Sequence, residues 1–309
     1  MKRRLLPLRP YLAPLGRALG FVATLSDDQT KILEAQIEQI NPDVILNQVP
    51  EFVNGDVLMR ARRAGRVIAV QHGNKPPDNF DPRPYTFAIS LIPAVVEFFR
   101  SKGVPAEQRH LAFDSVVLDR LGESPAKDLD VTFVGGLSSN HAQRIELLEA
   151  VARAFPVDLY LSGLKGIPAS SPLYARARGE AWGRDMYNVI RRSKITINSH
   201  IDAAKDMAGN VRLYEATGVG TFLLTDDLPN LPTLFQPGVH VETYRSAAEC
   251  VDKIRYYLAH DAEREAIAKA GQQHTLAHHT YRQRVTEFME LVDKYRPSTI
   301  HSPASALAK

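Results

Sequence analysis

One segment constrains the fold of this chain more than any other, because it has the pattern of a helix, a glycine turn and a buried strand in succession. It covers residues 209–227. Asn210 suits a helix N-cap, and Gly218 and Gly220 suit the left-handed positions that end a helix. The apolar residues 222–224 are typical of a strand covered on both faces. The pattern therefore predicts a helix packed beside a parallel sheet.

Three polar side chains of this segment could meet a ligand. A helix that begins at the edge of a parallel sheet offers N–H groups to an anion, and Glu215, one turn in, can accept hydrogen bonds from sugar hydroxyls. Arg212 could bind a diphosphate or a hydroxyl. The plainer alternatives are that Asn210 only caps the helix and that Glu215 is an exposed carboxylate paired with Arg212. The chemistry favours nucleotide-sugar binding.

The same residues resemble the donor-site signature of group 1 glycosyltransferases, in particular the spore-maturation-type branch. The likeness is carried by GNVRLYEATGVG and extends over most of residues 126–295. Further matching stretches are DVTFVGG (130–136), ITINSH (195–200) and HTYRQR (279–284), with looser ones at 41–46 and 92–103.

The resemblance implies a GT-B fold, in which two doubly wound Rossmann-like α/β domains face each other and a C-terminal helix packs back. It implies a glycosyltransferase in which Glu215 binds the donor ribose, with a nucleoside diphosphate sugar as donor substrate and no cofactor. Acceptor binding and the catalytic base belong to the first half in that family. Retaining members often carry a second glutamate eight positions earlier, where this chain has Met207, so the anomeric outcome stays open.

Composition and charge exclude several other classes of protein. At 309 residues two domains are expected, and no apolar run approaches the roughly 18 residues of a membrane span. A net charge of +3 is too small to indicate nucleic acid binding. A single cysteine, Cys250, allows no internal disulfide and favours the cytoplasm.

The first residues differ from the rest of the chain. Residues 1–12 are basic and apolar together, and this composition suits contact with an anionic membrane surface or a lipid-linked acceptor at the inner membrane face. A signal peptide is the rival interpretation. Prolines and arginines interrupt any apolar core that it would need.

Alternating strand and helix patterns predict parallel sheets in both halves. Strands are expected at 43–48, 66–71, 86–90 and 109–112, and then at 131–134, 158–161, 194–198, 221–225 and 238–241. Helices are expected at 55–64, 93–102, 115–121, 142–154, 183–192, 211–216, 247–259, 263–270 and 277–294.

The polar stretch at 122–128 is the expected domain boundary. It gives an acceptor-side domain at 1–125, a donor-binding domain at 126–295 and a tail at 296–309. The first domain lacks the opening strand and glycine loop of its relatives, so we expect it to be incomplete. Either the reading frame starts late, or the missing edge is supplied by something else, such as a second copy of the chain.

Five further donor-site candidates lie at or soon after the ends of strands in the second half. Gly135 and Gly136 could let backbone amides approach a pyrophosphate, although such glycines also occur in ordinary turns. Arg144 could neutralise phosphate or lie on a solvated face. Asn198 and His200 end a strand at the edge where ligands bind in open sheets. A loop histidine satisfied within the protein is an equal alternative for His200.

His72 is the candidate catalytic base for activating the acceptor. It follows the strand at 66–71 and opens a proline-rich loop. Asp114 is a second choice, and a histidine without a catalytic part is the alternative. The spaced histidines His274, His278 and His279 lack a third ligand or a nearby acid, so we expect no metal site.

The sequence thus predicts a metal-independent glycosyltransferase that moves a sugar from a nucleoside diphosphate to a glycan, lipid or small-molecule acceptor. The rival from another class is a non-catalytic, nucleotide-sugar-binding partner subunit with a degenerate first half.

Overall fold

The computed structural model describes residues 25–74, 76–77, 79–138, 141–164, 166–200 and 207–296. The basic segment at 1–12 lies outside these ranges. Within them, no helix is both long and apolar enough to cross a membrane.

The chain forms two compact units. Unit 1 comprises residues 1–110 together with 288–309, and unit 2 comprises residues 111–287. These units begin and end at other residues than the domains expected from the sequence. The stretch 111–125 lies in unit 2, and the last helix returns to unit 1.

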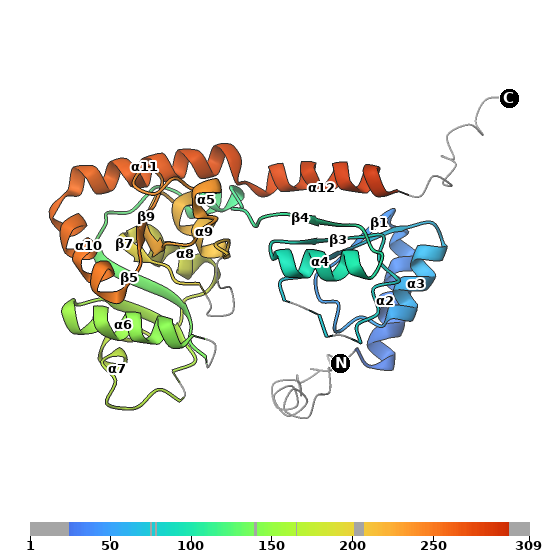
Figure 1. Ribbon diagram of the computed structural model, residues 1–309, viewed down its shortest axis with the longest axis horizontal. Helices are drawn as coiled ribbons and strands as arrows, with labels where there is room; N and C mark the ends of the chain where they lie inside the picture. Colours follow the sequence, from blue (N-terminus) through green and yellow to red (C-terminus); the bar gives the residue numbers. More distant parts are fainter. Residues whose placement is uncertain are drawn as a thin grey trace, which may run out of the picture. The chain divides into compact units, whose positions relative to one another are not determined.

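Unit 1 contains a parallel sheet of four described strands in the order β1-β2-β3-β4 (Figure 1). The strands are β1 (Val44–Asn47), β2 (Val67–Gln71), β3 (Phe87–Ser90) and β4 (Ala106–Gln108). The helices are α2 (Asp27–Ile40), α3 (Gly55–Arg63), α4 (Pro93–Ser101) and α12 (Tyr281–Tyr295), of which α12 begins in unit 2.

Each face of this sheet has its own apolar cluster. On one face, α3 and α4 pack against Ile68 and Val70 of β2. On the other face, Leu291 and Val292 of α12 pack against Val67 of β2 and Phe87 of β3. The C-terminal helix therefore does pack back, and it covers a sheet face of unit 1.

Unit 2 contains a parallel sheet of five described strands in the order β6-β5-β7-β8-β9. The strands are β5 (Leu129–Gly136), β6 (Asp158–Ser162), β7 (Ser193–Ile197), β8 (Phe222–Asp226) and β9 (Glu242–Tyr244). The helices are α5 (Val116–Leu121), α6 (Ala142–Ala154), α7 (Leu173–Arg176), α8 (Gly183–Arg192), α9 (Val211–Gly218), α10 (Ala247–Ala259) and α11 (Asp261–His278), with a 3₁₀ turn η2 (Leu231–Thr233).

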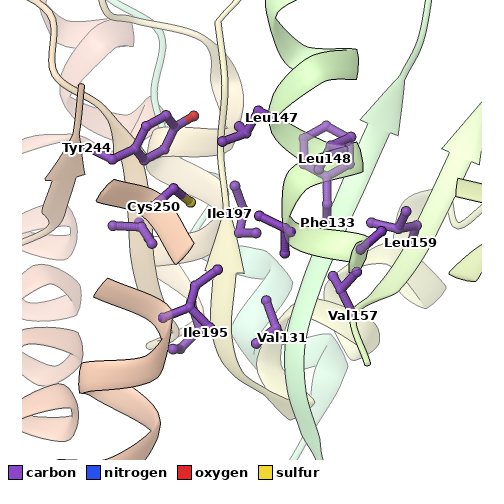
Figure 2. Packing of buried hydrophobic residues seen from close by; sticks show 14 of the residues in the cluster. Val131, Phe133, Leu147, Leu148, Val157, Leu159, Ile195, Ile197, Tyr244 and Cys250 are labelled. Atoms are coloured by element: carbon purple, nitrogen blue, oxygen red, sulfur yellow. The ribbon is translucent and has the colours of Figure 1, made fainter. Parts of the chain in front are cut away.

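Helices cover both faces of this second sheet. Figure 2 shows Leu147 and Leu148 of α6 packed with Phe133 of β5 and Ile197 of β7, and Cys250 of α10 belongs to the same cluster. On the opposite face, α8 and α9 form a second buried cluster with residues of β5 and β8. The fold is therefore α/β with two Rossmann-like sheets, as the sequence predicts.

Two predicted strands were placed wrongly, and both lie at sheet edges. β4 is at 106–108 rather than 109–112, because Leu111 and Phe113 pack into the second cluster of unit 2 instead. β9 is at 242–244 rather than 238–241, because Gly238 turns the chain with a φ of 76°. Edge strands carry fewer apolar residues, so periodicity locates them poorly.

The sequence predicted two left-handed glycines at the end of the signature helix, and the structure has one of them. Gly220 has a φ of 75° and supplies the left-handed turn, but Gly218 is the last residue of α9 and has no positive φ. A Cβ at Gly218 would lie 2.4 Å from the Phe113 ring. Gly218 is therefore required by close packing and not by its backbone conformation.

A similar close approach yields a stability prediction. A Cβ at Gly271 in α11 would lie 2.2 Å from the backbone carbonyl oxygen of His240, which cannot move aside as a side chain would. Gly271→Ala is expected to lower the free energy of unfolding by about 1 to 3 kcal/mol, measured by thermal denaturation. Gly73→Ala is the control, because nothing lies within 4 Å of its added Cβ, and its stability should stay unchanged or rise by up to about 1 kcal/mol. Equal stability of the two variants would contradict the close packing.

Candidate functional site

The candidate donor site lies at the carboxyl edge of the second sheet. β5, β7 and β8 end there at Gly136, Ile197 and Asp226, and α9 begins at Val211. Carboxyl ends of parallel strands meet at one edge, where open α/β sheets bind their ligands.

Glu215 and Arg212 form a buried ion pair at this edge. Glu215 Oε2 lies 2.8 Å from Arg212 Nη1, and the two side chains are only 12% and 14% exposed. Arg212 also donates to the Val134 carbonyl at 3.1 Å, and the Tyr187 hydroxyl donates to Glu215 Oε1 at 3.4 Å. The pairing allowed by the sequence therefore forms, but below the surface and next to the end of β5.

Burial perturbs both partners of this pair. It raises the pKa of the Glu215 carboxyl, although Arg212 and Tyr187 act in the opposite direction. Burial likewise lowers the pKa of the Arg212 guanidinium, against the effect of Glu215. The two facing atoms have no further hydrogen-bond partner among the described residues. Charged groups held in this way retain capacity for a polar ligand.

Arg212 also lines a small pocket of about 30 Å³ together with the last residues of β5 and β6. Trp182 borders the same pocket and donates its indole N–H to Glu180 at 2.8 Å. The other lining residues are Val134, Gly135, Tyr160, Ser162, Ala181 and Met186. Glu215 is not on the pocket wall and reaches it only through Arg212.

Asn210 takes the N-cap position of α9, but its side chain makes no cap hydrogen bond. Instead the amides of Asn210 and Asn198 pair with each other at 2.9 and 3.1 Å. Asn198 also donates to Thr225 Oγ1 at 3.0 Å. The expected side-chain cap is therefore wrong, because a neighbouring amide takes its place and links α9 to β7.

The ring of His200 is used within the protein. Nδ1 lies 2.7 Å from Asp226 Oδ1, and Nε2 accepts the backbone N–H of Gly209 at 3.1 Å. Burial raises the pKa of Asp226, but the hydrogen bonds from His200 outweigh it and hold this pKa below its usual value. The ring is therefore the satisfied histidine that the sequence left as an alternative, and it orders the start of α9.

Arg144 is buried and braces two loops at the same edge. Its guanidinium donates to the Gly136 carbonyl at 2.8 Å and to the Ser199 carbonyl at 2.6 Å, and it lies 5.6 Å from the Phe133 ring centroid. The solvated-face alternative is therefore wrong. At Gly135 and Gly136 a Cβ would approach Phe133 Cζ to 2.9 Å and Ser162 Oγ to 3.3 Å, so both positions are crowded.

His72 lies in unit 1, just beyond β2. Its ring is buried, and Nε2 lies 3.0 Å from Glu51 Oε1. Burial lowers the pKa of His72, against the opposing charge of Glu51. Glu51 also lines a pocket of about 190 Å³ with Phe80 and Tyr85.

Sequence reasoning assigned no role to two carboxylates of these sites. Glu51 and Asp226 each follow or end a strand, and each bonds the histidine of its own unit. A carboxylate just past a strand was the available signal. Periodicity does not show which distant histidine such a carboxylate meets.

Two of the three spaced histidines at the end of α11 bond the same backbone carbonyl. His274 and His279 both bond the Leu234 carbonyl, at 2.8 and 3.1 Å. In the described part of the chain, no group of three or more His, Cys, Asp or Glu side chains could hold a metal ion.

Comparisons with solved structures identify the class of fold. A glycosyltransferase from Rickettsia africae is similar with a TM-score of 0.62 and 10% identity, over 97% of this chain and 85% of that one. HepE from Anabaena, in complex with UDP-glucose, gives 0.59 and 16%, over 85% and 82%. Sucrose-phosphate synthase from Thermosynechococcus elongatus gives 0.58 and 14%, over 86% and 76%. The chain therefore has the GT-B fold of glycosyltransferases.

A family comparison places part of the chain more closely. Residues 143–290 match the model of the family described as "Glycosyl transferase-like". The matched segment contains α9 with Glu215 and covers just under half of the chain. A search of curated proteins found no match. Residues 143–290 are thus similar to this family, and the spore-maturation branch stays a prediction.

The role of Arg144 as a brace can be tested by Arg144→Met. The loss of its guanidinium leaves two buried carbonyl oxygens without a charged donor. The free energy of unfolding, measured by urea denaturation, should therefore fall by about 2 to 4 kcal/mol. Arg153→Met on the same helix is the control, because Arg153 is 61% exposed in a surface ion pair, and it should change stability by less than about 0.5 kcal/mol. Unchanged stability of Arg144→Met with lost nucleotide affinity would show instead that Arg144 binds the ligand directly.

Proposed function

We propose that this protein is a glycosyltransferase that moves a sugar from a nucleoside diphosphate sugar, with a UDP-sugar as the first donor to test. The observation that carries the proposal is the buried Glu215–Arg212 pair at the carboxyl edge of the second sheet. The GT-B fold and the glycosyltransferase-like match support the same conclusion. HepE, with a similar fold, binds UDP-glucose.

Each charged group has a role in the proposed donor site. Glu215 accepts hydrogen bonds from sugar hydroxyls, and Arg212 counters the charge of the diphosphate. The N-terminal amides of α9 point their dipole toward the same anion. Negative charge grows on the departing diphosphate in the transition state, so groups that are already in position there lower the barrier. In this proposal no resident metal is needed.

The acceptor side of the proposal rests on unit 1. Because the Glu51 carboxylate accepts from Nε2–H of His72, the neutral ring keeps a lone pair on Nδ1. That nitrogen can take the proton of an attacking hydroxyl, and Glu51 stabilises the imidazolium that forms. The proposed acceptor is a glycan, a lipid or a small molecule, and the proposed location is the cytoplasm.

The rival function is a non-catalytic partner subunit. A purified chain that binds a nucleoside diphosphate, but neither hydrolyses the sugar nucleotide nor transfers the sugar to any acceptor tested, would favour the rival. A calorimetric screen of UDP, GDP, ADP and dTDP comes first, because a ligand bound only by the folded state raises its stability.

The donor role of Glu215 predicts a loss of affinity in Glu215→Gln. The neutral amide keeps the size of the side chain but loses charge-assisted hydrogen bonds, so UDP-sugar affinity measured by calorimetry should fall about tenfold to a hundredfold. Glu265→Gln is the matched control, because Glu265 is 72% exposed in the same unit. If both variants bind the donor as tightly as the wild type, Glu215 is not a donor ligand.

The base role of His72 predicts a pH profile. Only the neutral ring can accept a proton, and burial lowers its pKa below the ordinary 6.5, so turnover should fall as the pH drops through that lowered value. Glu51→Gln removes the charge that raises this pKa, and it should move the acid limb to lower pH. His72→Gln should reduce turnover about 10²- to 10⁴-fold while UDP affinity, a property of unit 2, stays unchanged. An acid limb that stays in place in Glu51→Gln would exclude this base.

A further inference from the structure

The segment that leads into α9 is held by the side chains of two residues, Asn230 and His200. The amide of Asn230 bonds both backbone groups of Ala208, at 2.6 and 2.9 Å. His200 Nε2 accepts the N–H of Gly209 at 3.1 Å, with that of Asn210 at 3.4 Å. Residues 208–210 therefore enter the helix in one fixed path.

The hydrogen bonds around His200 determine its tautomer. Gly209 N–H is a donor, so Nε2 must carry a lone pair, and the proton of the neutral ring must lie on Nδ1. Asp226 Oδ1 accepts that proton at 2.7 Å, while Asp226 Oδ2 accepts the backbone N–H of His200 at 3.0 Å. One carboxylate thus fixes both the position and the protonated nitrogen of the ring.

A second branch ties the same carboxylate to the helix cap. The Thr225 hydroxyl donates to Asp226 Oδ1 at 2.9 Å and accepts from Asn198 Nδ2 at 3.0 Å. Asn198 in turn pairs with Asn210. Both branches run from the end of β8 to the two residues that precede α9, Gly209 and Asn210.

We propose that His200 and Asp226 are positioning residues for the donor: the carboxylate locks His200 as the Nδ1–H tautomer, and the ring holds the start of α9 in the geometry that receives a nucleoside diphosphate. This inference rests on the proposed donor site. Neither side chain touches the donor, because both ring nitrogens already bond groups of the protein. The backbone amides of Gly209 and Asn210 are therefore already in position in the free protein. The ligand does not have to order them when it binds.

The isosteric variant Asp226→Asn tests the tautomer directly. The backbone N–H of His200 cannot change, so the amide oxygen must face it and the NH₂ group must face Nδ1. The proton of the ring then moves to Nε2. There the ring N–H faces the N–H of Gly209, and the hydrogen bond that holds residues 208–210 is lost. Two-bond ¹⁵N–¹H spectra of the histidine ring distinguish the tautomers. We expect Nδ1–H in the wild type and Nε2–H in the variant.

The same variant should bind UDP about tenfold to a hundredfold more weakly in calorimetry, since one buried donor has lost its acceptor. Asp227→Asn is the matched control, because it removes the same charge at the neighbouring position. The carboxylate of Asp227 pairs with the exposed Arg245 instead of with His200. The control should leave both the tautomer and the affinity unchanged. A purely structural role would lower the melting temperature of Asp226→Asn while UDP affinity stayed at the control value.

A second pair of variants covers the case in which Asp226→Asn does not fold. The side-chain oxygen of His200→Gln can still accept from Gly209, whereas His200→Leu has no acceptor. We expect His200→Gln to bind UDP at least about tenfold more tightly than His200→Leu.

The outcomes separate this inference from the proposed function. A wild-type chain that binds no nucleoside diphosphate overturns both. A wild-type chain that binds UDP overturns the inference alone if Asp226→Asn keeps the Nδ1–H tautomer or binds like Asp227→Asn, or if His200→Gln and His200→Leu bind alike.

Discussion

A parallel sheet has no face that tolerates water, and this constraint explains why the end of the chain returns to the first unit. Strands of such sheets are apolar on both sides and need helices on both. In unit 1, α3 and α4 cover one face of β2 and β3. The described residues before α12 supply no helix for the other face, and Leu291 and Val292 of α12 fill that position. Tyr295 and Lys294 then hold the end of the helix on Glu107 of β4.

Once both sheets are covered, polar groups concentrate at their carboxyl edges, and burial changes their properties. Glu215 and Arg212 are shielded enough for burial to dominate both of their pKa shifts, each toward the neutral form. An ion pair in such a place contributes little net stability, because the loss of hydration offsets much of the attraction. A small net contribution to stability agrees with the ligand role that we propose for the pair. Burial also raises the pKa of the Cys250 thiol, to about 12. Unlike the Glu215–Arg212 pair, this thiol lies in an apolar cluster and not among polar groups at a sheet edge.

The sequence predicted the central elements well and the polar contacts poorly, and the reason is physical. Central strands such as β2 and β8 are apolar runs whose burial dictates their pattern, so they lie where periodicity places them. The edge strand β9 contains Glu242, which is satisfied by Lys253 and Tyr257 of α10, and no local pattern announces such a partner. The break between α11 and α12 was likewise misplaced, because the backbone of Phe113, far away in the sequence, bonds His279 and Tyr281 there.

The candidate site shows the same division between type of residue and role of residue. The sequence predicted that polar side chains gather at one sheet edge, but the side chains of Asn210, His200 and Arg144 all make their hydrogen bonds to neighbouring parts of the protein. Such bonds depend on which strands lie side by side, and that is a property of topology. A site whose outer groups are satisfied by each other can keep its inner charged pair in one geometry without a ligand. In the donor site that we propose, the binding of the donor by Glu215 therefore depends on the order of the loops that these groups connect.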